Sequence, residues 1–132
     1  MISRRLHRLF GLSIPFFIIH GVEEYWFGFY DVYPLFHSTA TIFQTTPQGI
    51  FLVFQIMWWL MLLMVFLTSL GGEWQLIPMT MLGLIYLYEL NHPFGALFQG
   101  SYYPGLLTSL PFPIIAFLFW RELLRIFRSA QA

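Results

Sequence analysis

Residues 48–70 read QGIFLVFQIMWWLMLLMVFLTSL, an apolar run without a single charged side chain. A helix needs about 20 apolar residues to cross the roughly 30 Å hydrocarbon core of a bilayer, so this run predicts a transmembrane helix. Three further apolar stretches lie at residues 9–30, 74–91 and 104–120. The sequence therefore predicts an all-α, polytopic membrane protein, a four-transmembrane-helix bundle in which residues 1–132 form a single helical domain.

The composition also favours a membrane location. Of 132 residues, 58% are hydrophobic and only 9% are charged, whereas a soluble domain carries about 25% charged residues. Four spans would use roughly 80 residues, which leaves no room for a separate soluble domain. The absence of cysteine excludes disulfides, thiolate metal sites and cysteine nucleophiles. A net charge of +0 argues against nucleic acid as a partner and leaves membrane lipid as the expected surrounding.

The basic residues predict the orientation of the bundle. All of them lie in the two tails, at Arg4, Arg5, Arg8, Arg121, Arg125 and Arg128. The positive-inside rule then places both termini in the cytoplasm, in what we expect to be the plasma (cytoplasmic) membrane, and requires an even number of spans. Aromatic residues are expected at the two interfaces, with Trp74 and Trp120 at the inner one and Tyr30, Tyr33, Tyr102 and Tyr103 at the outer one.

Proline, glycine and polar residues predict the connections between the spans. Residues 31–47 and 93–103 are expected to be loops, and residues 69–73 a tight turn, because such residues gather there. Pro111 and Pro113 are expected to bend the last span, since proline removes a helical hydrogen bond.

Two short motifs carry ionisable residues into the predicted spans. The first is His20-Gly21-Val22-Glu23-Glu24, and the second is Glu89-Leu90-Asn91-His92. Positions i, i+3 and i+4 share one face of a helix, so the members of each motif are expected to project together. The first and third spans run in the same direction, which places both motifs in the outer half of the membrane at a similar depth.

Charge makes this cluster a candidate functional site. Glu23, Glu24 and Glu89 have no Lys or Arg in their half of the sequence. An unpaired ionised carboxylate in a bilayer costs at least roughly 2.5 to 3.5 kcal/mol, against a total stability of about 5 to 15 kcal/mol. These glutamates must therefore bind a cation, bind protons or line a wet cavity. The alternative is that these residues have a purely structural role, as a polar network that joins the first and third spans.

A divalent metal ion is our leading hypothesis, with zinc or iron as the expected cofactor. Glu-x-x-His pairs on facing helices build metal sites in helical bundles, and histidine with carboxylates suits zinc. The candidate ligands are His20, Glu23, Glu24, Glu89 and His92. A complete di-iron set would need a fourth carboxylate, such as Asp31 from the following loop. One metal ion is therefore the simpler expectation.

The function predicted from this cluster is that of a membrane-embedded metal-dependent enzyme acting on a lipid-like or otherwise hydrophobic substrate. Glu24 is the candidate general base toward a metal-bound water, and Glu23 and Glu89 are the other candidate catalytic carboxylates. The expected substrate pocket is lined by Trp58, Trp59, Tyr88, Asn91 and Tyr103.

Two other classes of function use the same residues. Crowded carboxylates cannot all ionise, so one keeps a proton that it can donate and take back, as in a metal-free proton-shuttling isomerase or cyclase. The third hypothesis is a carrier or binding protein for a metal ion, a proton or a small lipid. A carrier of this size would have to form a homo-oligomer, because a monomer with four spans leaves little room for alternating access.

The two motifs together resemble a known family. His20-Gly21-Val22-Glu23-Glu24 in a first span, with Asn91-His92 and Tyr103-Pro104-Gly105 further on, is similar to the HXXEE-domain family of small integral membrane proteins. The resemblance covers most of the chain and implies that His20, Glu23 and Glu24 act together. It implies no particular activity.

Overall fold

The structure is a computed structural model that describes residues 2–71 and 75–131, and within them all regular structure is helical. The prediction of an all-α chain is confirmed. The helices, in chain order, are α1 (Arg4–Trp26), α2 (Phe29–Val32), α3 (Pro34–Ile42), α4 (Pro47–Ser69), α5 (Leu76–Tyr88), α6 (Asn91–Gln99), α7 (Leu106–Ser109) and α8 (Phe112–Gln131).

The helix α1 carries the first motif along a continuous buried stripe. It begins at the N-cap Ser3, whose side chain accepts a hydrogen bond from the Leu6 backbone N–H. Such a cap satisfies a donor that has no partner within the helix. The buried positions then recur every three or four residues, as helical geometry requires, at Leu6, Phe10, Ser13, Phe17 and His20. The last turns of α1 therefore deliver His20 to the interior.

The helix α4 coincides closely with the uncharged run that predicted it. Thr46 caps its N-terminus by accepting a hydrogen bond from the Gly49 N–H, and Pro47 occupies the first turn. Among the described residues, α4 is the one helix that is both long and apolar enough to cross a bilayer, with a mean hydropathy of 2.5. The other predicted spans are interrupted or carry charged residues. The structure therefore establishes an all-helical fold but does not establish the predicted number of four transmembrane spans.

The third predicted span is shorter than expected. The helix α5 has 13 residues, which at 1.5 Å per residue reach about 20 Å. The chain turns at Glu89 and Leu90, and a separate helix, α6, begins at Asn91. Most of the expected loop at residues 93–103 is therefore helical. The helix accommodates Pro93 because this residue lies in the first turn of α6, where its missing N–H leaves no bond unmade.

Two other expectations about the connections also change. Within the predicted loop at residues 31–47, the chain forms α3, whose Phe36 and Ala40 lie one turn apart and are buried. The burial of these two apolar side chains stabilises a helix in a segment whose polar composition predicted a loop. The last predicted span divides into α7 and α8 beside Pro111, and α8 continues to Gln131 through the basic tail. The turn predicted at residues 69–73 falls partly outside the described residues, and Trp74 falls wholly outside them.

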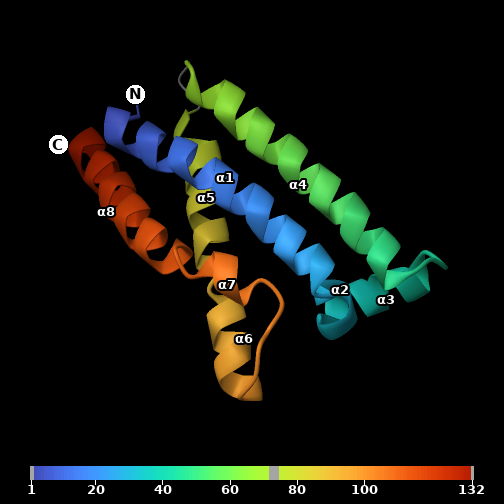
Figure 1. The fold of residues 1–132 in the computed structure, drawn as a ribbon. Coiled ribbons are helices and arrows are strands. Elements are labelled where there is room, and N and C mark those ends of the chain that lie inside the picture. The colour runs from blue at the N-terminus through green and yellow to red at the C-terminus, as the bar shows by residue number, and fades with distance from the viewer. Residues whose placement is uncertain (1, 72–74, 132) are drawn as a thin grey trace.

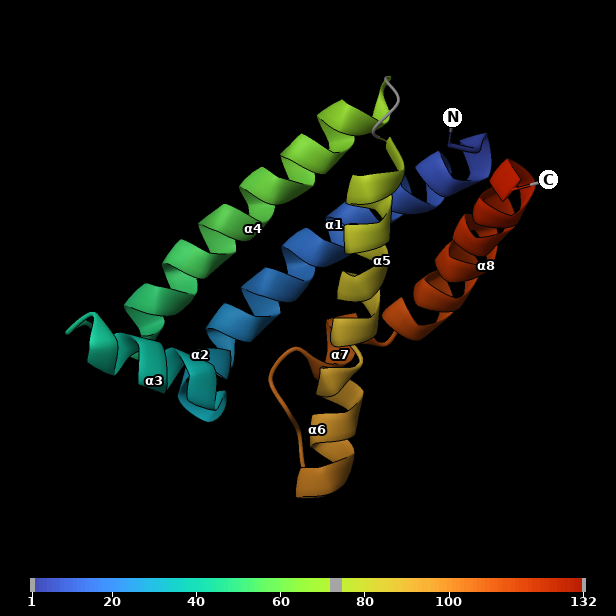
Figure 2. The ribbon, with the colours of Figure 1, turned by 180° about the vertical axis from the view of Figure 1, so that it is seen from behind.

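The long helices lie side by side with the two termini together at one end (Figure 1). The helix α1 lies between α4 and α8, and α5 lies behind them in this view. The Ser3 hydroxyl donates a hydrogen bond of 2.6 Å to Glu122 of α8, which ties the two tails together. Seen from behind, α4 and α5 diverge from the end at which the chain joins them (Figure 2).

Two apolar clusters enclose a polar layer. The larger one joins α1, α4, α5 and α8, with Phe17 and Phe112 at its boundary with the polar layer. The smaller one is built from Phe29, Phe36, Phe51 and Tyr103. The first cluster contacts the His20 ring through Phe112, with ring centroids 5.5 Å apart, and the second contacts the His92 ring through Phe29 at 5.0 Å. The layer between them contains the two predicted motifs.

Candidate metal centre

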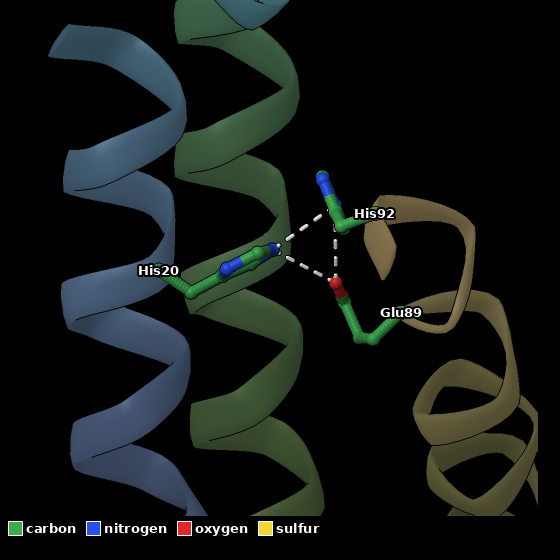
Figure 3. Close-up of side chains that lie close together, drawn as sticks. All are labelled: His20, Glu89 and His92. Atoms are coloured by element: carbon green, nitrogen blue, oxygen red, sulfur yellow. Dashed lines mark hydrogen bonds and ion pairs between the residues drawn. The ribbon is translucent and has the colours of Figure 1, made fainter. Parts of the chain in front are cut away.

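Two histidines from distant parts of the chain meet in the polar layer. His20 comes from the last turns of α1, and His92 comes from the first turn of α6. Their Nε2 atoms lie 3.1 Å apart, and both side chains are almost wholly buried. Figure 3 shows the His20 side chain pointing toward His92 and Glu89. Glu89 lies just before α6, and His92 lies in its first turn. The structure thus brings the two motifs together.

Two carboxylates complete the cluster. Glu89 Oε2 lies 2.9 Å from His20 Nε2 and 3.5 Å from His92 Nε2. Glu24 Oε1 lies 3.3 Å from His92 Nε2 and 3.7 Å from His20 Nε2. One ligand atom from each of His20, Glu89 and His92 lies within 4.8 Å of the other two, the spacing of a possible metal site. We call His20, Glu24, Glu89 and His92 the His/Glu cluster.

The hydrogen-bond partner of His92 assigns its tautomer. Its Nδ1 lies 2.7 Å from the backbone carbonyl oxygen of Pro104. A carbonyl oxygen can only accept, so His92 carries a hydrogen on Nδ1. A neutral imidazole with that hydrogen presents a lone pair at Nε2. In its neutral form, His92 therefore directs an acceptor into the cluster.

His20 reaches the same state through a longer chain of contacts. The Thr108 hydroxyl donates to the Glu23 carboxylate, which is an acceptor. The Thr108 oxygen is therefore left to accept from His20 Nδ1, which lies 2.8 Å away. With its hydrogen on Nδ1, a neutral His20 also presents a lone pair at Nε2.

When both imidazoles are neutral and both carboxylates are ionised, four acceptor atoms converge in the cluster. They are the Nε2 atoms of His20 and His92 and one carboxylate oxygen each of Glu24 and Glu89. The one His–His and four His–Glu separations, 2.9 to 3.7 Å, lie on either side of the value for neighbouring ligands in a tetrahedral site. Metal–ligand bonds of 2.0 to 2.1 Å place such ligands about 3.3 Å apart. The ligand atoms of His20, Glu89 and His92 therefore have the mutual spacing of a site for one small divalent cation, and Glu24 lies beside both histidines.

Gly105 packs directly against both imidazoles. Its φ of +87° lies in the left-handed region, which a residue with a side chain rarely adopts. A Cβ at this position would lie 2.6 Å from His92 Nδ1 and 2.7 Å from His20 Cε1. Glycine is thus required here both by the backbone conformation and by the close approach of the two rings.

The structure does not bring Glu23 into the cluster. Its carboxylate accepts hydrogen bonds from the Tyr102 hydroxyl at 2.5 Å, from the backbone N–H groups of Leu107 and Thr108 at 3.1 and 2.8 Å, and from the Thr108 hydroxyl. Burial and the neighbouring Glu23 carboxylate raise the pKa of Tyr102, which keeps that hydroxyl a donor. Glu23 therefore holds the start of α7, and Thr108 with it, against His20.

The groups that orient the two histidines could hardly be predicted from the sequence. Thr108 is an ordinary residue in an apolar segment, and the Pro104 group that orients His92 is a backbone carbonyl. The glycine and proline of Tyr103-Pro104-Gly105 are a detectable signal, although the sequence alone indicates only the start of a helix there.

An apolar cavity of about 440 Å³ adjoins the cluster and is lined by His20, Glu24 and Glu89. Of the predicted pocket residues, Trp58 and Tyr88 line this cavity. Trp59 lines a different apolar hollow, beside Ile14. The Asn91 side chain donates to the Tyr88 carbonyl at 2.9 Å, and Tyr103 packs on the His92 ring with centroids 5.8 Å apart.

Fold and site together define a class: a small all-helical protein with a buried cluster of two histidines and two glutamates beside an apolar cavity. The family model described as "Protein of unknown function with HXXEE motif" matches residues 12–120. The chain therefore belongs to the HXXEE family, and His20, Glu23 and Glu24 are the residues that give the motif its name. No curated protein and no solved structure matches the chain.

Proposed function

We propose that this protein is a membrane-embedded metal-dependent enzyme that acts on a lipid-like or hydrophobic substrate. The observation that carries the proposal is the convergence of two imidazole nitrogens and two carboxylates in the His/Glu cluster, with both imidazoles held by partners outside it. Every basic residue of the chain lies in the two tails. A cation from solution is therefore the natural partner of this cluster.

Charge balance favours a divalent ion. With both imidazoles neutral and both carboxylates ionised, the cluster would carry a charge of −2, which one divalent cation would neutralise. This matters because an uncompensated charge in a medium of low dielectric constant is strongly unfavourable. Nitrogen and carboxylate ligands suit zinc and non-haem iron, so these are the cofactors we propose.

The cluster presents only some of its members to the cavity. His20, Glu24 and Glu89 line the cavity, whereas His92 lies behind them with 0% of its surface exposed. When bound, a divalent cation would polarise a substrate oxygen as a Lewis acid or supply an activated water nucleophile. Glu24 contacts both the cluster and the cavity, so it is placed to accept a proton from a reacting group.

The surface supports a location in a membrane. The helix α4 passes the length and hydropathy requirements of a span, and large apolar side chains are exposed on other helices as well. Leu97 and Phe98 of α6, for example, are 77% and 89% exposed. A soluble monomer rarely exposes extensive apolar surface, whereas lipid acyl chains would cover it.

The enzymatic part of the proposal is tested with purified protein reconstituted into liposomes of a total lipid extract. Mass spectrometry of the extracted hydrophobic compounds is expected to show one compound consumed and another formed by wild-type protein, and neither change with Glu24→Gln. A chelator should stop the reaction, and either zinc or iron should restore it.

Other outcomes of this experiment would overturn the proposal. A reaction that ignores the chelator and shows a bell-shaped pH profile would support a proton-shuttling isomerase or cyclase instead. Movement of a compound across the sealed liposomes without chemical change would support a carrier. No change with the metal-loaded protein would contradict an enzyme.

A further inference from the structure

One polar side chain in the wall of the cavity has no partner in the described part of the chain. Gln55 lies in the middle of the apolar helix α4, lines the cavity beside Glu24, and is only 5% exposed. None of the hydrogen bonds among residues 2–71 and 75–131 involves its amide. Its amide atoms are not sealed from solvent, because no described side-chain polar atom is both fully buried and unpaired. The amide is therefore available to hydrogen-bond a molecule in the cavity.

The first motif is shaped to admit this amide. A Cβ on Gly21 would collide with Gln55 Nε2 and would lie 2.6 Å from Gln55 Cδ. The side chain of Gln55 thus occupies the space that any other residue at position 21 would fill. Because Gly21 follows His20 directly, the Gln55 amide of α4 packs against the part of α1 that contributes His20 to the His/Glu cluster. The lining of the cavity thus includes the Gln55 side chain in addition to His20, Glu24 and Glu89.

The rest of the cavity wall is apolar and aromatic. Phe36, Phe54, Trp58 and Met61 lie in it, together with residues of α1 and α5. The α4 residues come from the first two thirds of that helix and the α5 residues from its end, where the two helices have diverged (Figure 2). A cavity of 300 to 1,000 Å³ with few polar groups is typical of a site for a small organic molecule, and 440 Å³ falls in that range.

We propose that the cavity binds an uncharged amphipathic molecule whose carbonyl or hydroxyl oxygen is recognised by the Gln55 amide while its hydrocarbon body packs against the aromatic wall. This inference rests on the proposed function and names the class of its substrate. Gln55 is uncharged, so it pairs with a neutral oxygen at a smaller desolvation cost than with an ion. An amide both donates and accepts hydrogen bonds, which suits a carbonyl or a hydroxyl group.

The proposal is tested with three probes that share one carbon skeleton: undecane, 2-undecanol and 2-undecanone, the last labelled with ¹³C at its carbonyl. Binding to detergent-purified protein is followed by NMR. We expect wild-type protein to bind the oxygenated probes about tenfold more tightly than undecane, and the carbonyl resonance to shift on binding. The Gln55→Met variant keeps the length of the side chain and should lose both the preference and the shift.

Two further variants separate recognition from folding. Gly21→Ala leaves Gln55 in the sequence but displaces its flexible amide, so it should also lose the preference. Gln99→Met makes the same chemical change at an exposed position and should bind as the wild type does. Equal binding of all three probes by wild type, or a preference that survives in Gln55→Met, would overturn the proposal.

Metal content is measured on the same preparations. Gln55→Met should retain the metal of the wild type, because Gln55 lies outside the His/Glu cluster. A wild type without metal that still prefers the oxygenated probes would refute the proposed metal enzyme and leave the recognition by Gln55 standing. The two proposals therefore fail separately.

Discussion

Glu23 and Glu24 are neighbours in the sequence and have different surroundings in the structure. Glu24 directs an oxygen to the histidines, whereas Glu23 accepts hydrogen bonds from the start of α7 and from Tyr102. Both positions share a helix face with His20, so spacing alone cannot distinguish them. The difference arises from Thr108, which lies between Glu23 and His20. Glu23 thus acts on the cluster through an intermediate residue.

This arrangement makes Thr108 a positioning residue. Thr108→Val preserves the shape of the side chain but removes the acceptor that fixes His20 Nδ1. Loss of such an outer contact typically weakens metal affinity 10- to 100-fold, and we expect a decrease in that range. Titration with cobalt(II), followed by its absorption spectrum, measures the affinity.

Thr68→Val serves as the matched control, because the Thr68 hydroxyl only donates to carbonyl groups of its own helix. Equal cobalt affinity in Thr108→Val and Thr68→Val would show that the tautomer of His20 is not held by this contact.

Gly105→Ala should damage the cluster more than a strained backbone alone would. A residue with a Cβ in the left-handed region costs about 1 to 2 kcal/mol, and at Gly105 that Cβ would also collide with both imidazoles. We expect a loss of metal binding together with a loss of stability larger than about 2 kcal/mol. Cobalt titration and thermal unfolding measure the two effects.

Gly100→Ala isolates the backbone contribution. Gly100 has a φ of +63°, and nothing lies within 4 Å of a Cβ built there. This variant should lose only about 1 to 2 kcal/mol of stability and keep its metal. If both glycine variants behave alike, the close approach to the histidines is unimportant.

Among the helices, α4 is well predicted by the sequence, whereas the bounds of the other helices differ from those of the predicted spans. The helix α4 is predicted almost to the residue because its apolar run, its cap and its proline agree. The helix α3 escapes prediction because its polar composition resembles a loop, and it is held by the burial of Phe36 and Ala40. The helix α5 ends at Tyr88, before the predicted end of the third span at residue 91, and a new helix begins at Asn91.

The candidate site shows the same division between local and long-range information. Helical spacing within each motif is enough to place His20 with Glu24, and Glu89 with His92. That the two motifs meet depends on the packing of α1 against α7 and α8, which a single sequence does not specify. The carbonyl of Pro104 has no side-chain signal at all.

The cap of α4 gives a prediction about a single helix. Thr46→Ala removes the hydroxyl that accepts from the Gly49 N–H, and loss of such a cap costs about 1 kcal/mol. Thermal unfolding in detergent should show a lower midpoint. Thr41→Ala removes an exposed hydroxyl that only donates to the His37 carbonyl, so its midpoint should remain near that of the wild type. A lowering of equal size in both variants would contradict the assigned cap.

In the molecule as a whole, the two tails lie together at one end, and α6 projects at the other (Figure 1). If the helices cross a membrane, Ser129 and Gln99 should therefore lie on opposite sides. The chain contains no cysteine, so a single introduced cysteine reports one position. In intact cells, an impermeant maleimide should label Gln99→Cys and should label Ser129→Cys only after the membrane is opened. Labelling of both in intact cells would contradict the proposed orientation.

The proposed enzyme depends on a cation in the His/Glu cluster, and elemental analysis of detergent-purified protein that was never exposed to chelator measures that cation. We expect about one equivalent of zinc or iron per chain. The double variant Glu24→Gln, Glu89→Gln should lose it, and Glu122→Gln, which changes a buried glutamate bonded to Ser3 far from the cluster, should keep it. A folded wild-type protein without bound metal would contradict the proposed metal centre and the enzyme built on it.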